Sequence, residues 1–138
     1  MRGFRQLSHT ADVKIEAWGP NFSVALVECV RGFTSLVTDV GAVEKSEERI
    51  LVLTASTRER LLYDLIDQLV YLKDTETFLT SDATFVVSND GGAWQLTGTL
   101  RGTCLVGHQL DDVKAMTYHD MKIDEKDDAV IITYVVDL

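Results

Sequence analysis

Two aspartates near opposite ends of this 138-residue chain, Asp12 and Asp137, have the clearest capacity for chemistry. Each belongs to a segment typical of a strand, and antiparallel pairing of the first and last strands would bring the two carboxylates together. The terminal carboxylate of Leu138 adds negative charge at the same place. Such a cluster needs a cation, a lysine or protonation, and all-oxygen donors suit calcium or magnesium. The residues therefore predict either a divalent-ion site or solvated strand ends.

A second candidate segment covers residues 113–123, where alternation places His119 and Lys114 on opposite faces of one strand. We expect the face of His119 to point inward, which favours a hydrogen-bonded core histidine over a ligand. The opposite face carries Lys114, Met116 and Tyr118 and is expected to point to solvent.

Nucleophilic catalysis has little support in the sequence. The phosphate-binding, zinc-protease and serine-hydrolase motifs are absent, and Ser8, His9 and Asp12 are too close along one strand to form a triad. Cys29 lies on an apolar helical stripe and is expected to be structural, whereas Cys104 is ambiguous. We therefore expect no catalytic residue.

The elements that position these residues follow from local patterns. Residues 11–18 alternate as a strand, Asn21 can cap a helix that continues to about Thr38, and residues 47–54 form a second strand. Ser56 and Glu59 form a capping box before a second helix. The remaining strands are expected at residues 84–89, 94–99, 113–123 and 130–137, with turns at 90–92 and 124–128.

This order predicts an α+β fold in a single domain of residues 1–138, with two helices packed on one face of a largely antiparallel sheet. The composition agrees with a globular protein, since 46% of residues are hydrophobic and 25% are charged. The net charge of −9 disfavours direct nucleic-acid binding. We also expect a cytoplasmic protein without a targeting segment or a membrane span.

Four motifs closely resemble the archease family, in order along the whole chain. They are His9-Thr10-Ala11-Asp12-Val13, Leu61-Leu62-Tyr63-Asp64 continuing to Leu72-Lys73-Asp74-Thr75-Glu76, Val113-Lys114-Ala115-Met116-Thr117-Tyr118-His119, and Val136-Asp137-Leu138. Two places depart from the family pattern: residues 102–107, and Thr77, which stands where glycine is common.

The resemblance implies a non-enzymatic activator of the RtcB-type RNA-splicing ligase, which acts in tRNA splicing and RNA repair. Such a protein promotes guanylylation of the GTP-dependent ligase and so supports multiple turnover. The resemblance also implies a divalent ion, with calcium favoured over magnesium, held by Asp12, Asp137 and Leu138. Lys114 is implied to act on the ligase, and His9 and His119 are candidates for contacts to the ion's ligands.

Two other functions stay open. One is a metal-dependent hydrolase that uses Asp12 and Asp137 around an activated water, which needs an open coordination position and a general base. The other is a general chaperone-like interaction module. A homo-oligomer is compatible with all three functions.

Overall fold

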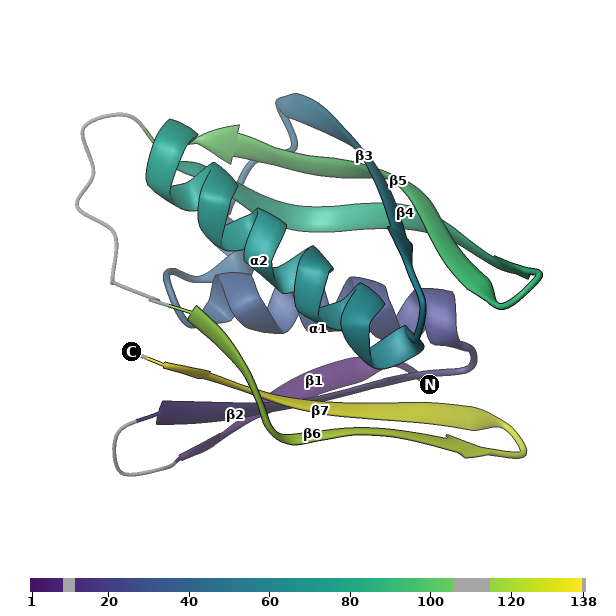
Figure 1. Cartoon of the computed structure of the whole chain (residues 1–138). Coiled ribbons are helices and arrows are strands. Elements are labelled where there is room, and N and C mark those ends of the chain that lie inside the picture. The colour runs from purple at the N-terminus through teal and green to yellow at the C-terminus, as the bar shows by residue number, and fades with distance from the viewer. Residues whose placement is uncertain (9–11, 106–114, 138) are drawn as a thin grey trace.

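The computed structural model describes residues 1–8, 12–105 and 115–137 (Figure 1). Its seven strands and two α-helices follow the order expected from the sequence, with one additional strand at the N-terminus. The elements are β1 (Gly3–Ser8), β2 (Asp12–Gly19), α1 (Phe22–Ser35), a 3₁₀ turn (Val40–Ala42), β3 (Glu47–Ala55), α2 (Arg58–Glu76), β4 (Phe78–Asp90), β5 (Ala93–Cys104), β6 (Ala115–Lys126) and β7 (Ala129–Asp137).

The strands form two antiparallel sheets, and the two helices lie between them (Figure 1). Sheet A has the strand order β1-β2-β7-β6, and sheet B has the order β3-β5-β4. Helix α1 packs against β2 of sheet A and β4 of sheet B, while α2 packs against β6 and β3. The predicted α+β class with two helices and antiparallel strands is confirmed.

The structure differs from the expected arrangement in having a second sheet on the other side of the helices. The cause is visible in α1, where Val27 and Thr34 are buried although they lie outside the apolar stripe seen in the sequence. The hydroxyl of Thr34 donates to the carbonyl of Thr80 in β4 at 2.6 Å. A helix that is buried on more than one side needs a second covering layer, which sheet B supplies.

Strand β1 is absent from the sequence-based expectations because it is an edge strand whose polar and apolar residues do not alternate clearly. It pairs antiparallel with β2, with Phe4 opposite Ala17. The inner side of β1 contacts α1, where Gln6 donates to the hydroxyl and the carbonyl of Ser35.

The ends of several elements also differ from the expectations. The N-cap of α2 is Thr57, whose side chain accepts from the amide of Arg60, and not the predicted Ser56. Asn21 caps α1 as predicted, but the helix ends at Ser35. The described part of the chain contains no helix that is long and apolar enough to cross a membrane.

The turns of the β4–β5 and β6–β7 hairpins show where these four strands begin and end. The β4–β5 turn at Gly91 and Gly92 is confirmed, and both glycines have positive φ angles of 62° and 87°. In contrast, the charged turn expected over residues 124–128 is shorter, because β6 continues to Lys126 and β7 begins at Ala129. The strands β4 and β5 are likewise longer than expected.

Helix α2 ends at a strained residue. Thr77 has φ 51° and ψ 28°, and its amide donates to the carbonyls of Leu72 and Lys73. This left-handed conformation at a helix C-terminus favours glycine, since a β-branched side chain crowds the backbone there. The position is the one at which Thr77 departs from the family pattern.

We expect Thr77→Gly to raise the free energy of unfolding by about 0.5–1 kcal/mol, because relief of the left-handed strain exceeds the entropy cost of glycine. Urea unfolding followed by circular dichroism measures the change. Thr75→Gly, two residues earlier and inside the helix, should instead lower the stability. Destabilisation by both substitutions would contradict the role given to Thr77.

Candidate functional site

The first and last strands expected from the sequence pair as neighbours, and their ends coincide. Asp12 of β2 lies directly opposite Asp137 of β7. On the other side of β7, Asp137 is paired with Ala115, the first residue of β6. Three strands therefore place Asp12, Asp137 and Ala115 in one row at one end of sheet A.

Both aspartates lie on the face of sheet A that is turned away from the helices. Ile15 and Tyr134 lie three positions from Asp12 and Asp137 along their strands and are completely buried against the helices. Because side chains alternate between the two faces of a strand, the two aspartates point away from the helices. Asp12 is half-buried and Asp137 is exposed. Directly opposed like charges on one sheet face repel each other, which favours a cation at this place.

Within residues 1–8, 12–105 and 115–137 there is no cluster of three or more His, Cys, Asp or Glu side chains suited to a metal. Leu138, His9 and Lys114 lie outside the described residues, as does the side chain of His119. The structure thus brings Asp12 and Asp137 together and leaves the other predicted site residues as predictions.

The predicted outward face of β6 is wrong at Met116. Met116 is only 4% exposed and belongs to the core, whereas Tyr118 stacks on Tyr63 of α2 and keeps 48% of its surface exposed. The pairing with β7 is irregular between Thr117 and Lys122, after which Ile123 occupies the inner face. Extra residues at this bulge reverse the alternation, so the pattern of one half of the strand cannot be extended to the other.

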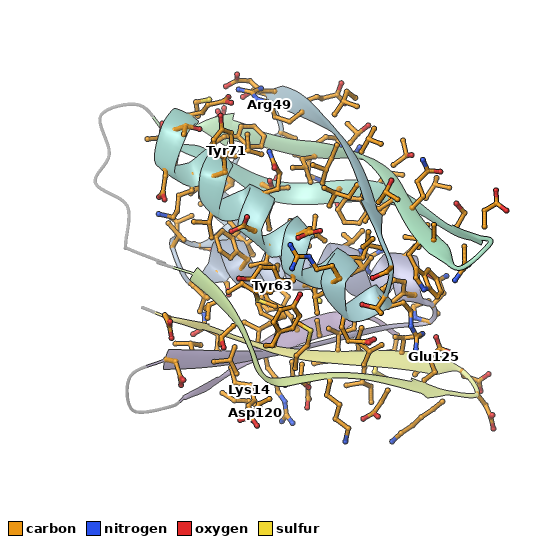
Figure 2. All side chains as sticks on the ribbon, viewed as in Figure 1. Lys14, Arg49, Tyr63, Tyr71, Asp120 and Glu125 are labelled. Carbon is orange, nitrogen blue, oxygen red and sulfur yellow. The ribbon has the colours of Figure 1, made fainter. Side chains whose placement is uncertain are left out.

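Asp120 lies within the bulge and has a φ of 56°. Aspartate is among the few residues that adopt this left-handed conformation readily. Its carboxylate lies 3.6 Å from the ammonium of Lys14, and the two side chains project together from the outer face of sheet A (Figure 2). They line a shallow concavity of about 450 Å³ with Glu16 and Lys122. This concavity could not be foreseen from the sequence, because part of its lining comes from the irregular segment of β6 around Asp120.

On the inner side of the bulge, β6 makes an aromatic contact with α2. The rings of Tyr63 and Tyr118 stack with centroids 4.5 Å apart. Arg60 donates to the hydroxyl of Tyr118 at 3.3 Å and pairs with Asp64 at 3.0 Å. These contacts tie the first half of β6 to α2, three residues after the Ala115 that pairs with Asp137.

The two cysteines have different surroundings. Cys29 is fully buried in α1, as predicted, and burial raises the pKa of its thiol well above the usual value. Cys104 is half-buried, and burial followed by the hydrogen bond to Glu47 raises the pKa of this thiol too. A raised pKa disfavours the reactive thiolate, so neither cysteine has the properties of a catalytic nucleophile.

Comparison with known proteins identifies relatives along the whole chain. The model of the Archease protein family (MTH1598/TM1083) matches residues 4–138. A protein archease of Methanothermobacter thermautotrophicus is 33% identical over 140 residues, and one of Sulfurisphaera tokodaii is 35% identical over 141 residues. Each alignment covers 100% of both chains.

Solved structures share the fold. The solution structure of protein 1598 of Methanobacterium thermoautotrophicum has a TM-score of 0.79 at 32% identity and covers 99% of each chain. The crystal structure of an archease and possible chaperone from Thermotoga maritima has a TM-score of 0.58 at 17% identity, covering 97% of this chain and 96% of its own. At 17% identity, the similarity to the Thermotoga maritima structure shows a shared fold alone.

We expect a thiol-specific reagent to modify only Cys104 in the folded protein and both cysteines after unfolding, because Cys29 is inaccessible. Quantifying the modified thiols by mass spectrometry gives the result for each residue. Cys104→Ser should abolish the reaction of the folded protein. Modification of Cys29 at native pH and temperature would show that the core around α1 opens more readily than its burial indicates.

Proposed function

The chain belongs to the archease family, and on this premise we propose that it is a metal-binding, non-enzymatic protein cofactor of the RtcB-type RNA-splicing ligase. In this function it promotes guanylylation of the ligase during tRNA splicing and RNA repair. The single observation that carries the proposal is the register pair of Asp12 and Asp137, which unites two separate family motifs in one row of sheet A.

The donor set of this row fits a hard divalent cation. Both described side chains are carboxylates on the same face, and calcium or magnesium prefers oxygen ligands. Asp12 and Asp137 would hold the ion, and Leu138 would complete the set that the family resemblance implies. When bound, the ion would neutralise the opposed charges and present a positive centre at the end of the sheet.

The position of the pair supports action on a partner protein. The aspartates occupy the outward face of sheet A, where an approaching macromolecule can reach the exposed Asp137. The net charge of −9 disfavours a direct encounter with RNA and leaves RNA recognition to the ligase. These two features favour the cofactor over the hydrolase and explain how an acidic protein can serve in RNA repair.

Calcium should raise the melting temperature of the wild-type protein, because an ion that binds only the folded state stabilises it. At a hundredfold excess over Kd the stabilisation is about 2.7 kcal/mol. Asp12→Asn and Asp137→Asn should each lose most of the calcium-dependent shift in a thermal melt. In the absence of the ion, Asp137→Asn should melt no lower than the wild type, since the substitution removes a like-charge contact.

Asp67→Asn is the matched control, because Asp67 is an exposed aspartate on α2. This variant should keep the full calcium-dependent shift. Repeating the thermal melts with magnesium in place of calcium shows which of the two ions binds more tightly. Equal shifts in the wild type and in both site variants would disprove the metal site, and absence of any shift in the wild type would do the same.

The ligase function is tested by adding the protein to the matching ligase with GTP and measuring guanylylated ligase over time. Wild-type protein should accelerate the reaction, and Lys114→Ala should abolish the acceleration. Lys122→Ala, which removes a lysine with 68% of its side chain exposed, should leave it intact. Failure of the wild-type protein to accelerate guanylylation, with calcium present, would reject the proposed function.

A further inference from the structure

An open pocket of about 360 Å³ lies where the N-terminus, α1, the segment of residues 40–45 and β4 meet. Its walls include the cationic side chains of Arg2, Arg31 and Lys45, together with Ser81 and Asp82. Three basic side chains converge here although the chain as a whole carries a net charge of −9. No residue of the pocket belongs to the row of Asp12 and Asp137.

A buried carboxylate holds two of the cations in place. The side chain of Glu28 is 0% exposed and receives Arg2 at 2.7 Å on Oε2 and Arg31 at 3.0 Å on Oε1. A buried carboxylate requires such pairing, because an unpaired charge in the interior is very costly. Glu28 thus fixes two guanidinium groups that would otherwise move freely at the surface.

The geometry of these contacts leaves part of each guanidinium available to the pocket. Arg2 uses Nε and Nη2 toward Glu28, and its Nη1 takes part in neither contact. Arg31 uses Nη1 toward Glu28 and Nε toward the carbonyl of Ser81, and its Nη2 takes part in neither. The two free amino groups carry N–H donors that suit an anionic oxygen.

The third cationic side chain, Lys45, is held less firmly than the two arginines. The ammonium of Lys45 lies 3.7 Å from Asp82, and 58% of its side chain is exposed. Asp82 also contacts Arg101 at 3.5 Å. The lining groups and their ion-pair partners therefore comprise four cations against the carboxylates of Glu28 and Asp82, which leaves an excess of two positive charges.

We propose that this pocket binds the phosphate group of a small molecule. A phosphate dianion matches the excess of two positive charges, and its oxygens suit the converging guanidinium and ammonium donors. Val40 and Val43 add an apolar wall beside these donors. The volume is within the range of small-molecule sites, so the pocket accommodates free phosphate or a larger molecule that carries it.

The test is a titration of ¹⁵N-labelled protein with inorganic phosphate, and separately with AMP, at constant ionic strength. Saturable shifts should appear in the backbone amides of residues 40–45 and of Ser81 and Asp82. Equal affinities would identify the phosphate group alone as the ligand. Tighter binding of AMP would show that the apolar wall also contacts the molecule that carries the phosphate.

Lys45→Gln is the informative variant, because Lys45 does not contact Glu28 and its loss should leave the fold intact. It should weaken phosphate binding by about tenfold, the effect of removing one charge-assisted hydrogen bond. Lys122→Gln, which removes the same charge on the outer face of sheet A, should change the affinity by less than about twofold.

Three results would overturn the proposal. The first is absence of saturable shifts with both probes, and the second is an unchanged affinity in Lys45→Gln. The third is a set of shifts that map to another part of the molecule. Because the ligase and calcium are absent from this titration, its outcome is independent of the function proposed above.

Discussion

The pairing of β2 with β7 is the interaction on which the core and the candidate site both depend. One face of this pair supplies Ile15 and Tyr134, which lie opposite each other and are fully buried. The hydroxyl of Tyr134 donates to the carbonyl of Cys29 in α1 at 2.7 Å, which satisfies a polar group in the interior. A shift of one residue would turn these side chains outward. The same register places Asp12 beside Asp137, so core packing specifies the geometry of the acidic pair.

Features of the fold that depend on local pattern could be predicted from the sequence. The helices, the Asn21 cap, the Gly91-Gly92 hairpin and the alternating β2 all follow from neighbouring residues. Even the meeting of Asp12 with Asp137 required only the assumption that the first and last strands expected from the sequence pair with each other. The second sheet could not be predicted in the same way, because the burial of Val27 and Thr34 reflects contacts with strands far along the chain. Strand β1 depends similarly on its partner β2.

The faces of β6 show why the rest of the candidate site was harder to predict. Alternation assumes a regular strand, whereas the bulge around Asp120 reverses which side chains point inward. Met116 consequently faces the core, and Tyr118 stacks on Tyr63 of α2 while 48% of its surface stays exposed. The apolar side chain of Met116 is consistent with an inward face, but the alternate residues of the strand, such as Met121 and Ile123, are apolar too. The choice between the two faces depends on packing between segments far apart in the chain, as in the burial of Met116 and the contact of Tyr118 with Tyr63.

Close packing between α1 and β2 links the two candidate sites mechanically. A Cβ atom on Gly32 would lie 2.8 Å from Cγ2 of Ile15, so glycine at this position permits the helix to approach the strand. Glu28 lies one turn earlier on the same side of α1, where it meets Arg2. Arg2 in turn leads into β1, the neighbour of β2 in sheet A. The helix position that Gly32 allows therefore sets the distance from Glu28 to Arg2. Asp12 is the first residue of β2, the strand against which Gly32 packs. A substitution that displaces α1 from β2 would consequently disturb the cationic pocket directly, and would reach the acidic row only through the β2 backbone.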